Sequence, residues 1–222
     1  MIKKFLSYLI PIPIEIIPSN VSEQLELTWN NGKLVLDTKH TNYSYGNLQK
    51  VLRKGLLKIG KENINQMQHI LLLGVAGGSV VETLTREFKF EKKITGIEID
   101  PVVIKVAEKY FHLNEIQNFE VILADANIFV TETKHIYDLI IIDIFEDCFM
   151  PDFVYSEAFI SNIKKILKPK GYILFNTIVL NKTAEEKNKS YKNQFESTKF
   201  VVQSFPNIDD KNELFLIKKE YE

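Results

Sequence analysis

Short runs of apolar residues alternate with amphipathic stretches over most of the chain, from residue 69 onward. Such runs between polar boundaries are typical of strands that are buried on both faces of a parallel sheet. The stretches between them repeat apolar residues at three- and four-residue spacing, which predicts helices with one buried face. The predicted strands are 70–73, 94–97, 119–123, 137–142, 172–180, 200–204 and 213–217. The helices predicted in this way are 79–88, 101–110, 128–133 and 156–167, and the charged stretch 181–198 is predicted to be a helix on an exposed face. This alternation predicts an α/β fold with a mostly parallel sheet and helices on both faces.

The first 60 residues follow a different pattern. Apolar and polar positions alternate on both sides of Asn30-Asn31-Gly32, a sequence that favours the positive φ angles of a hairpin turn. In order, we predict a hairpin at 24–37, a loop at 38–45, a helix at 46–59 and a polar linker at 60–68. We therefore divide the chain into an N-terminal extension, residues 1–60, with a β-hairpin and a helix, and an α/β domain, residues 61–222.

Composition and charge narrow the possible functions. Hydrophobic residues make up 45% of the 222 residues, which is enough for a full core. The formal net charge is −1 and the basic residues are scattered, which argues against nucleic acid as a partner. No apolar run approaches the roughly 20 residues that span a bilayer, so we expect no membrane partner. The four histidines lack metal-ligand spacing, so no metal site is predicted.

The cysteine content and the N-terminal residues bear on the cellular location. The single cysteine, Cys148, excludes an internal disulfide and fits a reducing compartment. Lys3, Lys4 and the apolar residues after them resemble the start of a signal peptide. Pro11 and Pro13 interrupt that run, however, and no cleavage site follows. We therefore expect a cytoplasmic protein.

The candidate chemistry begins where the first central strand ends. Gly74, Ala76, Gly77 and Gly78 follow that strand, and residues of this kind allow a tight turn and a close approach of the backbone to a ligand. Glu98 ends the next strand, 24 residues after Gly74, near the roughly 20 expected for an acid that binds a ribose. A glycine turn can also be purely structural, so the turn alone leaves both interpretations open.

Two further strands end on acidic residues, Asp125 and Asp143. Ligands of open α/β sheets bind outside the carboxyl ends of the strands, where these residues would lie. Either Asp125 or Asp100, which precedes Pro101, could instead be the N-cap of a helix. Because four strands end on glycine or an acid, the pattern as a whole predicts a nucleoside-type ligand.

The stretch from about Leu25 to Asn176 resembles spermidine synthases and their relatives among the class I methyltransferases that depend on S-adenosylmethionine. The resemblance is carried by LLLGVAGGSVVETL, ITGIEIDPVVIKVAEKYF, VILADA, YDLIIIDIFED and LKPKGYILFNT. It implies a Rossmann-like class I methyltransferase fold: a seven-stranded, mostly parallel sheet with helices on both faces, preceded by a small N-terminal β-hairpin extension. It also implies S-adenosylmethionine, or its decarboxylated form, as cofactor. Relatives are often dimers, so a homodimer is compatible with the resemblance.

The resemblance implies a role for each matching position. Glu98 would hold both ribose hydroxyls, and Asp125 would accept from the adenine amino group. Asp143 matches the acid that spermidine synthases use on the attacking amine, and Glu146 stands where these enzymes place a second acid. These two are the implied catalytic residues. The implied cofactor-binding residues are Gly74, Ala76, Gly77, Gly78, Glu98, Ile99, Asp125, Ala126 and Asp143.

The chain departs from spermidine synthases at two places. Those enzymes have an aspartate in the glycine turn where this chain has Gly77, and that acid faces the free amine of decarboxylated S-adenosylmethionine. It would repel the carboxylate of the ordinary cofactor. They also have a Tyr-Gln-Glu or Tyr-His-Glu run that contacts the polyamine, where this chain has Tyr45-Gly46-Asn47. Both changes remove groups that a cationic polyamine needs.

Three functions are compatible with these residues. We favour a methyltransferase that uses S-adenosylmethionine on a small acceptor, with Asp143 orienting or deprotonating the acceptor. The second is a polyamine aminopropyltransferase that uses decarboxylated S-adenosylmethionine and retains Asp143 and Glu146. The third is a protein that binds the nucleoside without turnover. The aromatic loop 144–155 either closes as a lid over the acceptor or packs against the neighbouring helix.

Overall fold

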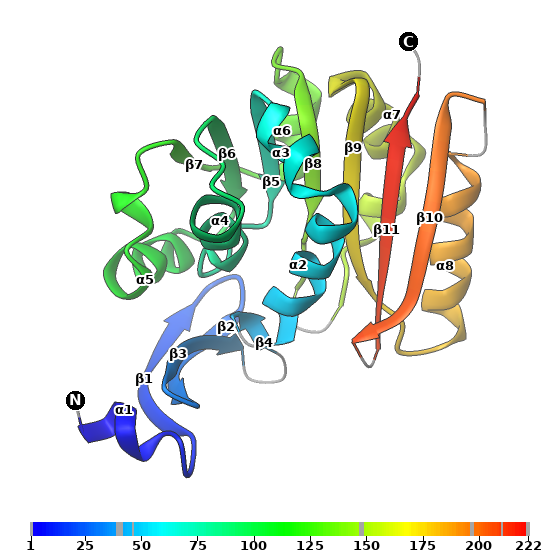
Figure 1. Ribbon diagram of the computed structural model, residues 1–222. Coiled ribbons are helices and arrows are strands. Elements are labelled where there is room, and N and C mark those ends of the chain that lie inside the picture. The colour runs from blue at the N-terminus through cyan, green and yellow to red at the C-terminus, as the bar shows by residue number, and fades with distance from the viewer. Residues whose placement is uncertain are drawn as a thin grey trace.

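The computed structural model describes residues 2–38, 42–45, 47–146, 149–195, 198–209 and 211–220. In these ranges the chain forms two sheets, one of seven strands and one of four (Figure 1). None of the described helices is long and apolar enough to cross a membrane.

The seven-stranded sheet is the centre of the molecule, and its strands lie in the order β10-β11-β9-β8-β5-β6-β7. Strands β5 to β9 run parallel, while β10 and β11 form an antiparallel hairpin at one edge. The chain winds from β5 outward to β7 and then returns to β8 on the other side of β5. The predicted Rossmann-like fold with a seven-stranded, mostly parallel sheet is therefore confirmed. The strands are β5 (His69–Leu73), β6 (Lys93–Glu98), β7 (Phe119–Leu123), β8 (Tyr137–Ile142), β9 (Leu167–Ile178), β10 (Phe200–Asp209) and β11 (Asn212–Lys219).

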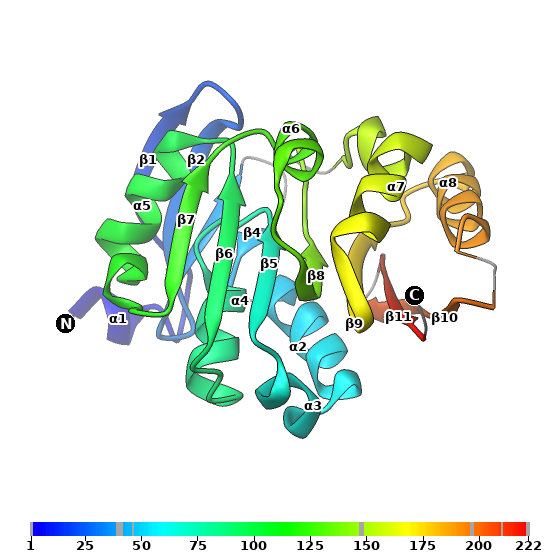
Figure 2. The same ribbon diagram turned by 90° about the horizontal axis from the view of Figure 1, so that it is seen from above.

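Helices cover both faces of this sheet (Figure 2). On one face lie α2 (Asn47–Ile59), α3 (Lys61–Gln66), α4 (Ser79–Glu82) with the π-helical segment Thr83–Glu87, and α5 (Pro101–Phe111). On the other face lie α6 (Ala126–Glu132), α7 (Glu157–Ile166) and α8 (Lys182–Asn193). Two short 3₁₀ helices, Leu113–Glu115 and Asp152–Tyr155, lie in the connections.

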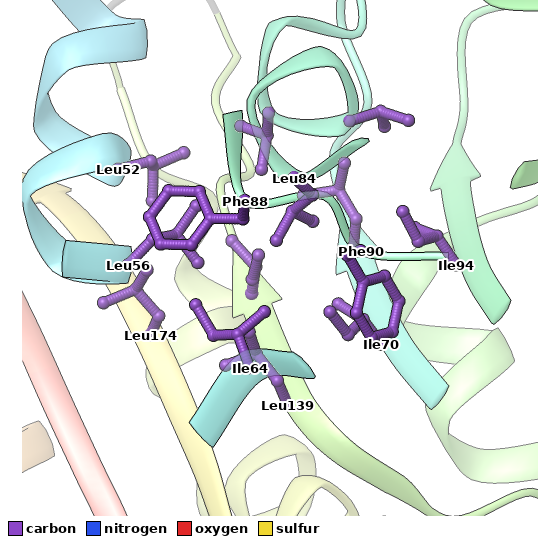
Figure 3. Packing of buried hydrophobic residues seen from close by; sticks show 14 of the residues in the cluster. Leu52, Leu56, Ile64, Ile70, Leu84, Phe88, Phe90, Ile94, Leu139 and Leu174 are labelled. Atoms are coloured by element: carbon purple, nitrogen blue, oxygen red, sulfur yellow. The ribbon is translucent and has the colours of Figure 1, made fainter. Parts of the chain in front are cut away.

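Helix α2 packs into the core of the large sheet. Its Leu52 and Leu56 are buried and belong to the same apolar cluster as Phe88 and Leu174, and Figure 3 shows both leucines directed toward Phe88. The contact between α2 and β9 leaves no room for a side chain on Gly55, because a Cβ there would lie 2.5 Å from Leu174 Cδ1. The domain boundary at residue 60 stays a prediction. Helix α2 precedes this boundary, but its apolar side chains pack into the core of the domain that follows it.

The four-stranded sheet extends the predicted hairpin in both directions. The hairpin itself is confirmed as β2 (Glu23–Asn30) and β3 (Lys33–Thr38), with Asn31 and Gly32 both at positive φ. Strand β1 (Ile12–Ser19), after the short helix α1 (Ile2–Leu6), pairs with β2, and β4 (Asn42–Ser44) pairs with β3. The sheet packs on α5 through Leu25, Leu27, Leu36, Val103 and Val106. The hydroxyl of Ser19 donates to Asp100, the N-cap of α5, so the small sheet is also tied to the end of β6 by a polar contact.

Three sequence predictions need correction. The stretch 60–68 is not only a linker, because Lys61–Gln66 forms α3 and buries Ile64. The loop 38–45 contains β4. The strand predicted at 172–180 begins earlier: β9 starts at Leu167, directly after α7, and runs through Lys168-Pro169-Lys170-Gly171, where Lys170 takes a positive φ of 63°.

Candidate functional site

A cleft lies at the carboxyl ends of β5, β6, β7 and β8, where the winding of the sheet changes direction between β5 and β8. It encloses about 850 Å³ of space outside protein atoms, including its open mouth. Its lining residues are Val21, Gly74, Ala76, Ile97, Glu98, Ile99, Ala124, Asp125, Ala126, Asp143, Ile144, Phe145, Glu146 and Phe153. The structure therefore brings most of the predicted site residues together.

Gly74 forms the floor of the cleft at the switch between strands. Its N–H donates to the carbonyl of Ile97 at 2.9 Å, and the N–H of Asp143 donates to the carbonyl of Leu73 at the same distance. Its φ is 88°, and a Cβ at this position would lie 2.2 Å from the carbonyl oxygen of Asp143. Only glycine fits here, because the φ is left-handed and the neighbouring backbone leaves no room for a side chain.

Gly77 and Gly78 do not line the cleft. Gly78 takes a φ of 84° at the N-cap of α4, where a Cβ would lie 2.6 Å from Leu113 Cδ1. Gly77 lies against the N-terminal sheet, where a Cβ would lie 2.9 Å from Ser44 Oγ and 3.2 Å from the ring of Tyr45. Ser44 therefore occupies the space into which a side chain at position 77 would extend.

Glu98 is buried at the end of β6, and its carboxylate joins two segments of backbone. Its Oε2 accepts from the N–H groups of Val75 and Ala76 at 3.1 and 3.0 Å, and its Oε1 accepts from Ile99 and Asp100 at 2.9 and 3.1 Å. Burial raises the pKa of this carboxyl, and the four N–H donors oppose that rise. These four hydrogen bonds occupy all four acceptor positions of the carboxylate. Glu98 can therefore accept from a ribose hydroxyl only if one of the four bonds breaks.

Asp125 lies on the opposite wall at the end of β7. Its Oδ1 accepts from the N–H groups of Asn127 and Ile128 at 2.7 and 3.3 Å, so it is the N-cap of α6. In the described part of the chain Oδ2 has no hydrogen-bond partner, which leaves one carboxylate oxygen for a ligand. Ile99 and Val21 also line the cleft, and at 50% and 41% exposed they present apolar surface to a ligand.

Asp143 lies at the end of β8, at the edge of the cleft. Asn176 of β9 donates from Nδ2 to Asp143 Oδ1 at 2.9 Å, and Asn212 of β11 donates to Asn176 Oδ1 at 3.0 Å. These two bonds fix the amide of Asn176 with its NH₂ group toward Asp143. Removal of the Asp143 carboxyl from water raises its pKa to about 7, and the bond from Asn176 opposes this. A carboxyl with a pKa near neutrality suits proton transfer at physiological pH.

The loop after Asp143 supplies the outer wall. Glu146 is exposed and lines the cleft, and its backbone pairs with that of Phe149 at 2.8 and 3.0 Å. Phe153 also lines the cleft and meets Phe159 of α7 edge to face at 5.2 Å, so this part of the loop packs against the helix. Phe149 is 64% exposed. Whether the loop moves as a lid stays a prediction, and Asp147 and Cys148 lie outside the described residues.

Tyr45, the residue of the Tyr45-Gly46-Asn47 run that matches spermidine synthases, is held by contacts with the large domain. Its ring stacks on Phe111 at 4.5 Å, and its hydroxyl bonds with Glu82. Burial is the main cause that raises its pKa. Gly46 lies outside the described residues, as does the side chain of Asn47.

Sequence reasoning missed the parts of the site that come from distant segments. Val21 reaches the cleft from the turn between β1 and β2, and no local motif marks it. Asn176 is fully buried and follows the apolar run 173–175 of β9, and a polar residue after such a run is a signal that could have identified it. Within the described residues no cluster of side chains is suited to hold a metal ion.

The family model of the spermine/spermidine synthase domain matches residues 49–221. The polyamine aminopropyltransferase of Vibrio vulnificus is 29% identical over 131 residues, which make up 58% of this chain and 44% of that enzyme. The eEF1A lysine and N-terminal methyltransferase homolog of Drosophila pseudoobscura pseudoobscura is 27% identical over 124 residues, or 51% of this chain and 18% of that protein. This chain thus spans less than half the length of these curated relatives.

Among solved structures, human methyltransferase-like protein 13 in complex with S-adenosylhomocysteine matches with a TM-score of 0.64 at 20% identity. The match covers 80% of this chain and 83% of that chain. At this level of identity the likeness concerns the fold.

Proposed function

Because the chain belongs to the spermine/spermidine synthase family, we propose that it is a transferase that binds S-adenosylmethionine and methylates a small acceptor. The observation that carries the methyl-transfer assignment is the contact of Gly77 with Ser44. An acidic side chain at position 77, as in spermidine synthases, has no room while Ser44 lies 2.9 Å from the Cβ position. The site therefore lacks the charge that would select the decarboxylated cofactor.

The residues that line the cleft suit a nucleoside cofactor by their chemistry. Asp125 offers a free carboxylate oxygen to an adenine amino group, and Ile99 and Val21 offer apolar surface in the same cleft. Glu98 lies at the position for a ribose, provided that one of its four backbone bonds opens. When bound, S-adenosylmethionine supplies a methyl group made electrophilic by its sulfonium.

The residues of this chain would position the acceptor and take its proton. Asp143, directed by Asn176, has a pKa of about 7 and can accept a proton from an acceptor hydroxyl or amine as it attacks the methyl carbon. Phe145 and Phe153 also line the cleft and would exclude water from a bound acceptor. Positioning supplies most of the rate in such a displacement, which is consistent with a site of few polar groups.

A second candidate function is aminopropyl transfer to a diamine. One observation favours it: Asp143 and Glu146 both line the cleft, so two carboxylates are available to an amine substrate. Against it, a diamine keeps one cationic end that needs its own anchor, and desolvation without such a partner is costly.

The experiment is a calorimetric titration of the purified protein with S-adenosylmethionine, S-adenosylhomocysteine and decarboxylated S-adenosylmethionine. We expect the first two to bind and the third to bind more weakly. In a second step the protein is incubated with decarboxylated S-adenosylmethionine and putrescine, and methylthioadenosine is measured. We expect none above background. Turnover at micromolar putrescine would replace the methyltransferase proposal with the aminopropyltransferase one.

A further inference from the structure

Two side-chain amides from neighbouring strands lie in a row behind Asp143. Strands β8, β9 and β11 are adjacent in the large sheet (Figure 1). Ile142 of β8 pairs with Phe175 of β9, so the residues that follow them, one on each strand, lie side by side at the carboxyl ends. These two residues are Asp143 and Asn176. Asn212 comes from β11, on the other side of β9, and is half-buried, whereas Asn176 is fully buried.

The hydrogen bonds of this row run in one direction. Asn212 donates from Nδ2 to Asn176 Oδ1 at 3.0 Å and to the backbone carbonyl of Thr177 at 3.4 Å. Asn176 in turn donates from Nδ2 to Asp143 Oδ1 at 2.9 Å. A backbone carbonyl can only accept, so Thr177 determines which end of the Asn212 amide faces β9. Asn176 then presents its oxygen to Asn212 and its NH₂ group to Asp143.

In the described part of the chain, the amide of Asn176 is the one group that donates a hydrogen bond to the Asp143 carboxylate. Burial raises the pKa of Asp143, and the bond from Asn176 opposes this rise. The other titratable residues that line the cleft are all acids: Glu98, Asp125 and Glu146. The residue paired with Asn212 in β10 is Asp209, another acid. None of these side chains can stabilise a second negative charge at Asp143, so its charged form depends on the direction of the Asn176 amide.

We propose that Asn212 is a positioning residue that keeps Asp143 a proton acceptor. Asn212 does not line the cleft and acts through Asn176, whose NH₂ group it holds toward the carboxylate. This inference rests on the proposed function, in which Asp143 takes the proton of the acceptor. Without Asn212 the Asn176 amide can turn. Its oxygen would then face Asp143, and two facing acceptors repel unless the acid retains its own proton. An acid that retains its proton cannot act as the base.

The test measures the proton affinity of Asp143 directly and needs no acceptor. The carboxyl carbon signals of the aspartates are followed by NMR as the pH is raised, and the signal of Asp143 is identified by its loss in Asp143→Asn. We expect Asn212→Ala to raise the pKa of Asp143 by about 1, a roughly tenfold gain in proton affinity, because a bond to a charged group is weakened. Asn176→Ala should raise it at least as much. The double variant should match Asn176→Ala, because Asn212 acts through Asn176.

The matched control is Asn188→Ala, which removes an amide bound to the next residue of β9. Asn188 of α8 is 2% exposed, and it donates from Nδ2 to Thr177 Oγ1 at 2.7 Å and to Glu213 at 2.8 Å. Successive residues of a strand face opposite sides of the sheet, so this variant disturbs β9 and β11 on the side away from Asn176. It should leave the pKa of Asp143 unchanged.

The inference would be overturned by an unchanged pKa in Asn212→Ala, by an equal shift in Asn188→Ala, or by a double variant that exceeds Asn176→Ala. Should Asn212→Ala fail to fold, Asn212→Asp replaces it, because aspartate has nearly the same size and can only accept when charged. This variant should raise the pKa of Asp143 more in the wild-type background than in Asn176→Ala, where only repulsion between the two acids remains. Equal rises in both backgrounds would contradict the inference.

A separate measurement decides the proposed function. Calorimetry of the wild type with S-adenosylhomocysteine shows whether the cofactor binds, and a wild type without affinity would refute the proposed function. The titration of Asp143 requires no ligand, so its result decides the role of Asn212 independently of that outcome.

Discussion

At the scale of single residues, the role of each carboxylate in the site depends on how many hydrogen-bond donors surround it. Glu98 receives four backbone N–H bonds and holds the turn, whereas Asp143 receives one side-chain bond from Asn176. Both have a raised pKa, chiefly because of burial. With one hydrogen bond and a pKa near 7, Asp143 is the residue suited to exchange protons.

The raised pKa of Asp143 predicts a measurable effect on stability. Its ordinary value is 3.8 and its value in the fold is about 7, so the folded state binds the proton more tightly. Stability therefore falls as the pH rises from about 4 to about 7, and Asp143→Asn removes this loss. In urea unfolding, the free energy of unfolding of the variant should rise by about 1–3 kcal/mol relative to the wild type as the pH goes from 5 to 8. This is less than the whole pKa shift corresponds to, because the carboxyl borders the open cleft. All other groups titrate alike in both proteins, so a constant difference across pH would contradict the assignment.

At the scale of elements, the turn after β5 shows how backbone contacts restrict the sequence. Gly74 and Gly60 have nearly the same φ, 88° and 90°. They differ in surroundings, because a Cβ on Gly74 meets the Asp143 carbonyl at 2.2 Å and a Cβ on Gly60 meets nothing closer than Asn63 at 3.8 Å.

This pair of glycines provides a matched test. Gly60→Ala should lose about 1–2 kcal/mol of unfolding free energy, the usual cost of a left-handed backbone. Gly74→Ala adds a collision between the new Cβ and the backbone carbonyl of Asp143, and should lose at least about 3 kcal/mol or fail to fold. Urea unfolding of both variants checks this. Equal losses would mean that the strands at the switch point separate without cost.

The sequence identified most elements because each buried strand and each helix has its own periodicity. The strands at 119–123 and 137–142 and the hairpin turn at Asn31-Gly32 were predicted where the structure has them. What it could not supply are contacts between distant segments: Val21 in the cleft, Ser44 against Gly77, and the bonds from Asn212 through Asn176 to Asp143. None of these has a local pattern, because each depends on the packing of one sheet or strand on another.

At the scale of the whole molecule, the small sheet and the large domain share contacts on both sides of the cleft. Val21 lines the cleft, Ser19 bonds with Asp100, and Ser44 lies on the glycine turn. Helix α2, which connects the two parts along the chain, buries Leu52 and Leu56 against the large sheet.

The packing of α2 predicts where the chain can be shortened. A fragment of residues 47–222 keeps α2 and should show a cooperative thermal transition by circular dichroism. A fragment of residues 61–222 loses four buried apolar side chains and exposes Leu174 and Leu214, so it should show no cooperative transition. Similar cooperative melting of both fragments would show that α2 is not part of the domain core.

The central claim is that a nucleoside cofactor binds where β5, β6, β7 and β8 end. It is tested most directly by amide NMR spectra of the full chain titrated with S-adenosylhomocysteine. We predict that the largest shifts cluster at Ala76, Ile99 and Ala126, which line the cleft, with smaller shifts in β10 and α8 at the far edge of the sheet. Shifts centred elsewhere, or none at millimolar ligand, would contradict the account.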